Sequence, residues 1–150
     1  MRLFLVFIVL ALPFSVASAQ EKVLLKDMIE LDSVKNIFVH RLTGNAADPP
    51  HLHGYGFVDT AEVKDTDLIR DIISELQYEL NRTRSGYAMC FAPRHAVSIE
   101  VAEKRVDFLL CYQCKNVGVY IDGVMDDRVA ISALSEGRFD MLFEMAGMKE

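Results

Sequence analysis

The chain has 150 residues, with 22 acidic and 16 basic side chains and a formal net charge of −6. This length suits one domain with its own hydrophobic core. The negative charge argues against binding to nucleic acid or to an anionic membrane surface, because both partners reward Lys and Arg. We therefore expect no nucleic-acid partner.

The N-terminus has the pattern of a secretory signal peptide. Arg2 precedes an apolar run from Leu3 to Leu12, and Ala17-Ser18-Ala19 offers small residues at a cleavage site. The run is shorter than the about 20 residues that cross a membrane. We expect cleavage after Ala19, no stable membrane span afterwards, and a secreted protein in the periplasm or outside the cell.

Cleavage defines the expected domain organisation, with a signal peptide over 1–19 and a single domain over 20–150. Because 19 of the 150 residues are removed, the mature chain has 131 residues. Arg2 is the only charged residue that is lost, so the net charge changes from −6 to −7.

The mature part alternates strand and helix patterns. Apolar residues spaced by one, three and four predict a helix over 66–81. A second helix is expected over 135–146. β-branched and aromatic residues predict strands over 36–42, 53–63, 87–91, 94–101, 105–112 and 117–121. Asp126-Asp127, further on, is interpreted as a solvated turn.

Strands joined by short turns indicate a mainly antiparallel sheet, so the expected fold class is α+β with two helices packed on one face. Residues 94–101 and 105–112 alternate as a hairpin. A two-residue turn at Glu103-Lys104 would place His95 opposite Tyr112. His95 and Cys111 would then point to opposite faces.

Three cysteines lie in two short segments, Cys90-Phe91-Ala92-Pro93-Arg94-His95 and Cys111-Tyr112-Gln113-Cys114. The pair resembles an uncharacterised group of small exported bacterial proteins with a Cys-aromatic-x-Pro-Arg-His segment followed by a Cys-aromatic-x-Cys segment. The resemblance covers roughly 36–148 in layout, and its specific motifs are these ten residues. It implies no activity, and marks Cys90, Pro93, Arg94, His95, Cys111 and Cys114 as positions of interest.

A structural disulfide is one interpretation of the cysteines. Disulfides persist in the oxidising compartments that exported proteins enter, and an odd count leaves one thiol over. We expect Cys90 to pair with Cys111 or Cys114. Cys111 and Cys114 could join each other only if the chain turns between them, because in an extended strand their Cα atoms are about 10 Å apart.

A metal site is the second interpretation. Cys90, His95, Cys111 and Cys114 match a tetrahedral zinc set, and thiolates also suit copper(I). Zinc or copper is therefore the candidate cofactor. The expected orientations of His95 and Cys111 count against this site, unless a bulge near Pro93 changes the register.

A thiol-disulfide redox protein using Cys111 and Cys114 is the third interpretation. A reactive thiolate in a Cys-x-x-Cys motif is usually stabilised at a helix N-terminus. Residues 115–120 instead predict a turn and a strand, so the expected order of strand, motif and helix is missing.

Other polar residues offer weaker signals. Arg94 has a fork of donors that could bind an anion, or tie down a carboxylate such as Asp107 or Glu100. The pair His51 and His53 could bind copper or zinc, but is more typical of a polar loop. The leading hypothesis is an exported, non-catalytic binding or structural domain of unknown function with a Cys/His cluster.

Overall fold

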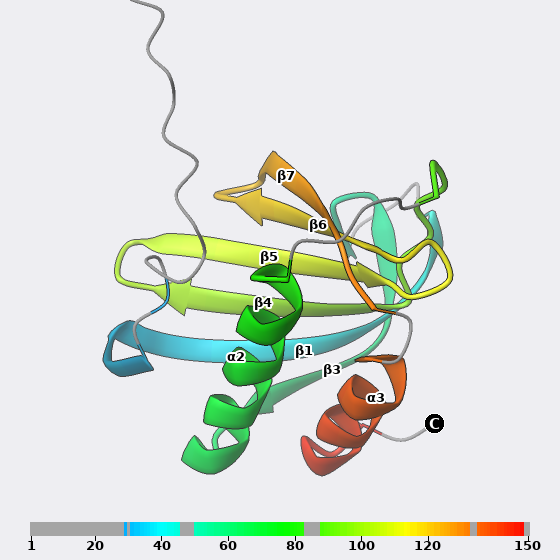
Figure 1. The fold of residues 1–150 in the computed structure, drawn as a ribbon. Coiled ribbons are helices and arrows are strands. Elements are labelled where there is room, and N and C mark those ends of the chain that lie inside the picture. Colours follow the sequence, from blue (N-terminus) through cyan, green and yellow to red (C-terminus); the bar gives the residue numbers. More distant parts are fainter. Residues whose placement is uncertain (1–28, 30, 46–49, 83–87, 133–134, 149–150) are drawn as a thin grey trace, which may run out of the picture.

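The computed structural model describes residues 29, 31–45, 50–82, 88–132 and 135–148 (Figure 1). The predicted signal peptide over 1–19 lies outside these residues. Within the described ranges, no helix combines the length and the apolar character needed to cross a membrane.

Seven strands form one curled antiparallel sheet in the order β2-β3-β1-β4-β5-β6-β7. With the two helices this gives an α+β fold, as predicted. The elements, in chain order, are η1 (Leu31–Ser33), β1 (Val34–Asn45), β2 (His51–Leu52), β3 (Tyr55–Val63), α2 (Thr66–Leu80), β4 (His95–Val101), β5 (Lys104–Cys111), β6 (Asn116–Ile121), β7 (Val124–Ala130) and α3 (Glu136–Met145).

Both predicted helices are confirmed to within one residue at each end. Asp65 caps the N-terminus of helix α2, and its carboxylate accepts a hydrogen bond from the Leu68 amide at 2.8 Å. Such a cap satisfies an amide that has no partner within the helix. Gly147, at φ +92°, ends the segment after α3 in the left-handed region that glycine adopts readily.

The main hydrophobic core joins the sheet to both helices. Val39, Val97, Phe108 and Val119 pair in register across β1, β4, β5 and β6. These four side chains belong to the same buried cluster as apolar residues of α2 and α3. The row explains why the alternation in the sequence was informative, since alternate residues of β4, β5 and β6 enter this core.

The β4–β5 hairpin has a register two residues away from the predicted one. Val101 pairs with Lys104, and His95 lies opposite Leu110 rather than Tyr112. Ala102 adopts a φ of +52° in the tight turn. The residue types in the sequence did not indicate this turn. Because a shift of two is one full strand period, His95 and Cys111 still belong to opposite faces.

Two further predictions, one of a strand and one of a turn, were wrong. The described part of 87–91, residues 88–91, is irregular rather than extended in the sheet. Conversely, Asp126-Asp127 lies within strand β7 and not in a turn. Strand β7 pairs only with β6, and charged residues are common on such an edge because they discourage pairing with other chains.

The curl of the sheet brings its β2–β3 end over β5 and β6. Register shifts interrupt β1 between Arg41 and Leu42 and again before Asn45, and bulges of this kind bend a strand. The ring of His53, in the β2–β3 turn, stacks on Tyr120 of β6 at 3.8 Å between ring centroids. A second buried cluster forms under this contact, containing Leu42, Leu52, Ala96, Leu109 and Tyr120.

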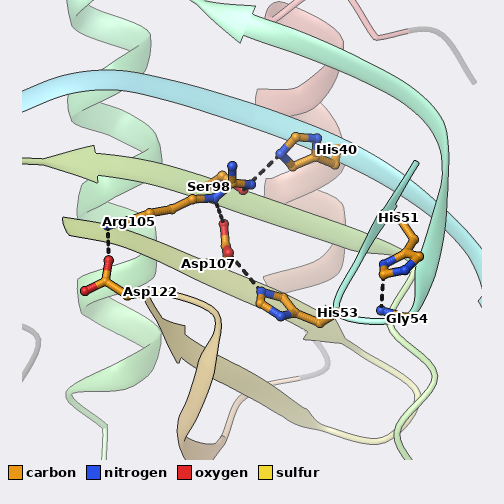
Figure 2. A network of polar contacts seen from close by, with 8 residues as sticks. All are labelled: His40, His51, His53, Gly54, Ser98, Arg105, Asp107 and Asp122. Atoms are coloured by element: carbon orange, nitrogen blue, oxygen red, sulfur yellow. Dashed lines mark hydrogen bonds and ion pairs between the residues drawn. The ribbon is translucent and has the colours of Figure 1, made fainter. Parts of the chain in front are cut away.

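A polar network fixes the curl (Figure 2). Asp107, with 3% of its side chain exposed, accepts a hydrogen bond from Arg105 Nε at 2.8 Å on one oxygen. Its other oxygen lies 2.8 Å from His53 Nε2. Arg105 also donates to Ser98 Oγ at 3.1 Å, and Ser98 Oγ lies 3.0 Å from His40 Nε2. Asp107 is therefore held by Arg105, and not by Arg94.

We predict that Asp107→Asn lowers the free energy of unfolding by about 1.5–3 kcal/mol, the usual contribution of hydrogen bonds to a charged group. The amide cannot accept on both sides, so one of its contacts to Arg105 and His53 is lost. Urea unfolding measures the change. Asp126→Asn, at an exposed position of β7, should stay within about 0.5 kcal/mol of the native protein. Equal stability of the two variants would contradict the role of Asp107.

Candidate functional site

The β5–β6 hairpin brings two of the three cysteines together. Cys111 ends β5 and pairs with Asn116, so that residues 112–115 form the connecting loop. The Lys115 amide donates to the Tyr112 carbonyl at 3.0 Å, and Lys115 has a φ of +52°. The chain therefore turns between Cys111 and Cys114, which is the condition for contact between their thiols.

The third cysteine is brought to this hairpin by backbone hydrogen bonds. The Ala88 amide donates to the Cys114 carbonyl at 3.0 Å. The fully buried Asn116 donates from Nδ2 to the carbonyls of Ala88 at 3.1 Å and Cys90 at 3.3 Å. One amide side chain thus fastens the irregular 88–91 segment to the start of β6.

The three thiols form a connected cluster centred on Cys114. The side chains of Cys90 and Cys111 both lie within hydrogen-bonding reach of the Cys114 side chain. The Ala92 amide is also a donor to this cluster, and lies 3.4 Å from Cys111 Sγ. Cys90 is exposed, whereas Cys111 and Cys114 are buried.

The predicted disulfide of Cys90 with Cys111 or Cys114 is not formed. All three cysteines lie within the described residues and are free, with no pair at bonding distance. A disulfide needs sulfurs about 2.05 Å apart, and no two of these three sulfurs approach each other that closely. The cluster is a set of thiols in contact and not a covalent staple.

The proton affinities of the three thiols differ. Burial would raise the pKa of Cys114, but hydrogen bonds from Cys111, Cys90 and Ala92, together with the charge of Arg128, lower it. Burial and the hydrogen bond to Cys114 raise the pKa of Cys111 to about 11. The hydrogen bond to Cys114 also raises the pKa of Cys90. Cys114 is therefore the first of the three to ionise, and ionised sulfur is the nucleophilic form.

Phe91 and Arg128 connect the cluster to β6 and β7. The Arg128 guanidinium lies 4.5 Å from the centroid of the Phe91 ring, within the range of a cation–π contact. A Cβ on Gly118 would come within 2.9 Å of Phe91 Cζ. The absence of a side chain at Gly118 thus makes room for the ring beside Cys90.

His95 does not join the thiols, so the proposed four-ligand zinc or copper set is not assembled. His95 faces Phe143 of α3, with ring centroids 5.2 Å apart, and its Nε2 lies 3.6 Å from Asp140 Oδ1. Arg94 is exposed beside it. In the part of the chain that the structure describes, no group of three or more Cys, His, Asp or Glu residues could hold a metal ion.

His51 and His53 also have separate positions. His51 is exposed, and its Nδ1 accepts from the Gly54 amide at 3.4 Å. His53 has a φ of +49° in the turn and bonds Asp107. The turn that begins at His53 removes the shared face that a regular strand would have given the two residues.

Comparisons of this chain with family models, curated proteins and solved structures found no match. The geometry of the thiol cluster therefore carries the functional argument.

Sequence reasoning identified the cysteines and missed the groups that tune them. Arg128 lies in a strand that was not predicted, and Asn116 acts on carbonyls 26 and 28 residues away. The Ala92 amide is a backbone group, so no residue type in the sequence marks it. The Cys-x-x-Cys spacing was the one available signal.

We predict that Gly118→Ala lowers the free energy of unfolding by about 1–3 kcal/mol, the usual cost of overpacking. The added methyl must displace the Phe91 ring. Gly137→Ala is the matched control, because a Cβ there meets nothing within 4 Å and alanine favours a helix by about 0.5–1 kcal/mol. Thermal or urea unfolding separates the two outcomes. An unchanged free energy of unfolding in Gly118→Ala would show that the Phe91 ring is not tightly packed.

We further predict that Arg128→Gln raises the pKa of Cys114. Loss of the positive charge disfavours the thiolate, so its ultraviolet absorbance should appear at higher pH in the reduced variant than in the native protein. Lys115→Gln removes an exposed cation from the loop that contains Cys114, and it should leave the midpoint of the thiol titration unchanged. Identical titrations of all three proteins would exclude the effect of Arg128.

Proposed function

We propose that this protein is an exported thiol-disulfide exchange protein with Cys114 as its nucleophile. The observation that carries the proposal is the meeting of three cysteine side chains at the β5–β6 hairpin, where the Ala92 amide donates to Cys111 Sγ at 3.4 Å and Arg128 lies nearby. These groups take the place of the helix N-terminus that stabilises many reactive thiolates. The missing helix after the motif is therefore no obstacle.

The first step is attack of the Cys114 thiolate on one sulfur of a disulfide R–S–S–R. A bond forms between Cys114 Sγ and that sulfur, the substrate disulfide breaks, and R–S⁻ leaves with the electron pair. The product is a mixed disulfide at Cys114. A second thiol of the cluster must then attack Cys114 Sγ to release the second R–S⁻.

Cys90 is the better candidate for this second thiol. Its pKa is raised first of all by its hydrogen bond to Cys114, and that effect weakens once Cys114 has lost its negative charge. The pKa of Cys111 is raised mainly by burial, which persists. Cys90 therefore gives its proton to solvent and forms a disulfide with Cys114, so that two electrons pass to the substrate.

Access to Cys114 favours small disulfides. Cys114 is only 2% exposed, and the adjoining segment 88–91 lies outside the helices and strands. A substrate must displace this segment, in which Ala88, Met89 and Cys90 are exposed. Bulky protein disulfides should react more slowly than small ones.

In the proposed arrangement, both helices cover one face of the sheet and the thiols lie toward its other face. It is supported by the shared cluster of helix and strand side chains, and by the position of Cys111 next to Leu110 in β5. A zinc or copper role has less support, because His95 is directed to α3.

We predict that glutathione disulfide oxidises the reduced mature protein with loss of two hydrogens and release of two glutathione molecules per chain. Mass spectrometry of the digested protein should locate a Cys90–Cys114 disulfide. Cys114→Ser should not react in this way. Cys90→Ser should stop at the mixed disulfide on Cys114, because the attacking thiol is missing.

The outcomes separate the proposal from its rival. Unchanged oxidation of Cys114→Ser would exclude Cys114 as the nucleophile. A wild-type protein that keeps three free thiols under excess glutathione disulfide would favour the non-catalytic binding or structural domain. Cys111→Ala should still form the disulfide, but more slowly, because one donor to the Cys114 thiolate is lost.

A further inference from the structure

A cavity lies away from the thiols, between α3 and the adjoining parts of β1, β3 and β4. Its volume is about 350 Å³, which lies within the range of about 300–1,000 Å³ that is typical of small-molecule sites. It shares none of its lining residues with the thiol cluster. A function of this cavity would therefore be independent of the proposed exchange reaction.

One wall of the cavity is a row of carboxylates on α3. Glu136, Asp140 and Glu144 line it, and their spacing of four places them on one side of the helix. Like charges at this spacing oppose helix formation by about 0.2–0.5 kcal/mol per pair. Within the described chain, the side chains of Glu136 and Glu144 form no ion pair, whereas Arg138 on the same helix bonds Glu75 at 2.8 Å.

The facing wall carries positive charge. Arg41 and Arg94 line the cavity from β1 and from the residue before β4. Among the residues that the structure describes, the exposed Arg94 guanidinium has no carboxylate partner. Arg94 thus faces the same space as the carboxylates of α3, and no ion pair joins it to them in the described residues.

His95 and three apolar side chains complete the lining. Burial, reinforced by Arg41 and Arg94 and opposed by Asp140, lowers the pKa of His95, so that its ring is neutral near pH 7. The 3.6 Å between His95 Nε2 and Asp140 Oδ1 is too long for a hydrogen bond. The apolar lining residues are Leu42, Val58 and Phe143.

We propose that this cavity binds a small zwitterion of the amino-acid type, a free amino acid or a dipeptide. The ligand carboxylate lies at Arg94, and the ligand ammonium lies at the carboxylates of α3. A simple anion would meet the three acidic side chains, and a simple cation would meet the two arginines. A ligand with both charges satisfies both walls, and an apolar side chain fits against Leu42, Val58 and Phe143.

Calorimetric titration of the mature, reduced protein with L-leucine and with L-leucyl-L-leucine tests this proposal. N-acetyl-L-leucine lacks the ammonium and L-leucinamide lacks the carboxylate. We expect each blocked compound to bind at least about tenfold more weakly than L-leucine, as for loss of one charged contact. Tighter binding of the dipeptide than of L-leucine would identify peptides as the source of the ligand, and the reverse would identify amino acids.

Variants assign the two ends of the ligand. Arg94→Gln should weaken L-leucine binding about tenfold and leave L-leucine and L-leucinamide nearly equal. The double variant Glu136→Gln, Glu144→Gln should instead remove the difference between L-leucine and N-acetyl-L-leucine. The exposed residues Lys104 and Glu103 provide matched controls, because Lys104→Gln and Glu103→Gln remove the same charges far from the cavity.

Two results would overturn the proposal: no heat of binding with either zwitterion, or equal affinity for zwitterions and blocked compounds. Neither result bears on the thiols, since no cysteine is changed. Failure of glutathione disulfide to oxidise the protein would, conversely, leave this site intact.

Discussion

The carboxylate of Asp107 holds together two parts of the sheet that the strand order separates. One oxygen is bonded within the same strand, to Arg105, and the other is bonded to His53 in the β2–β3 turn. Strands β1 and β4 lie between these partners in the sheet order. A buried carboxylate is costly unless both oxygens are satisfied, so the curl of the sheet and the burial of Asp107 require each other.

The geometry of the thiol cluster depends on this curl of the sheet. With the β2–β3 hairpin folded over, the Tyr55 hydroxyl donates to the Phe91 carbonyl at 3.2 Å, and Phe91 follows Cys90 directly. Asn116 and Arg128 hold the same segment from β6 and β7. The position of Cys90 beside Cys114 thus depends on four strands, which explains how an irregular segment presents a defined sulfur.

The local parts of this structure could be predicted from the sequence, and the long-range parts could not. Helix periodicity located α2 and α3, and strand alternation assigned His95 and Cys111 to opposite faces even though the hairpin register was off by two. Strand β7 was not predicted, because its charged residues suit a solvent-exposed edge and hide the pattern of a strand. His53 was paired in sequence with His51, but its partner proved to be Asp107, 54 residues later. Contacts of this kind depend on sheet curvature, which residue patterns do not encode.

His40 gives the polar network a consequence in proton linkage. Burial and Arg105 lower its pKa to about 4, while in the unfolded chain a histidine titrates near 6.5. Between these values the unfolded state binds the proton and the folded state does not, so stability is complete above the upper value and falls toward the lower one. The loss is about 3 kcal/mol for this residue, a substantial part of the stability of a small domain. The same imidazole that completes the hydrogen bonds of Ser98 at neutral pH therefore makes the fold sensitive to acid.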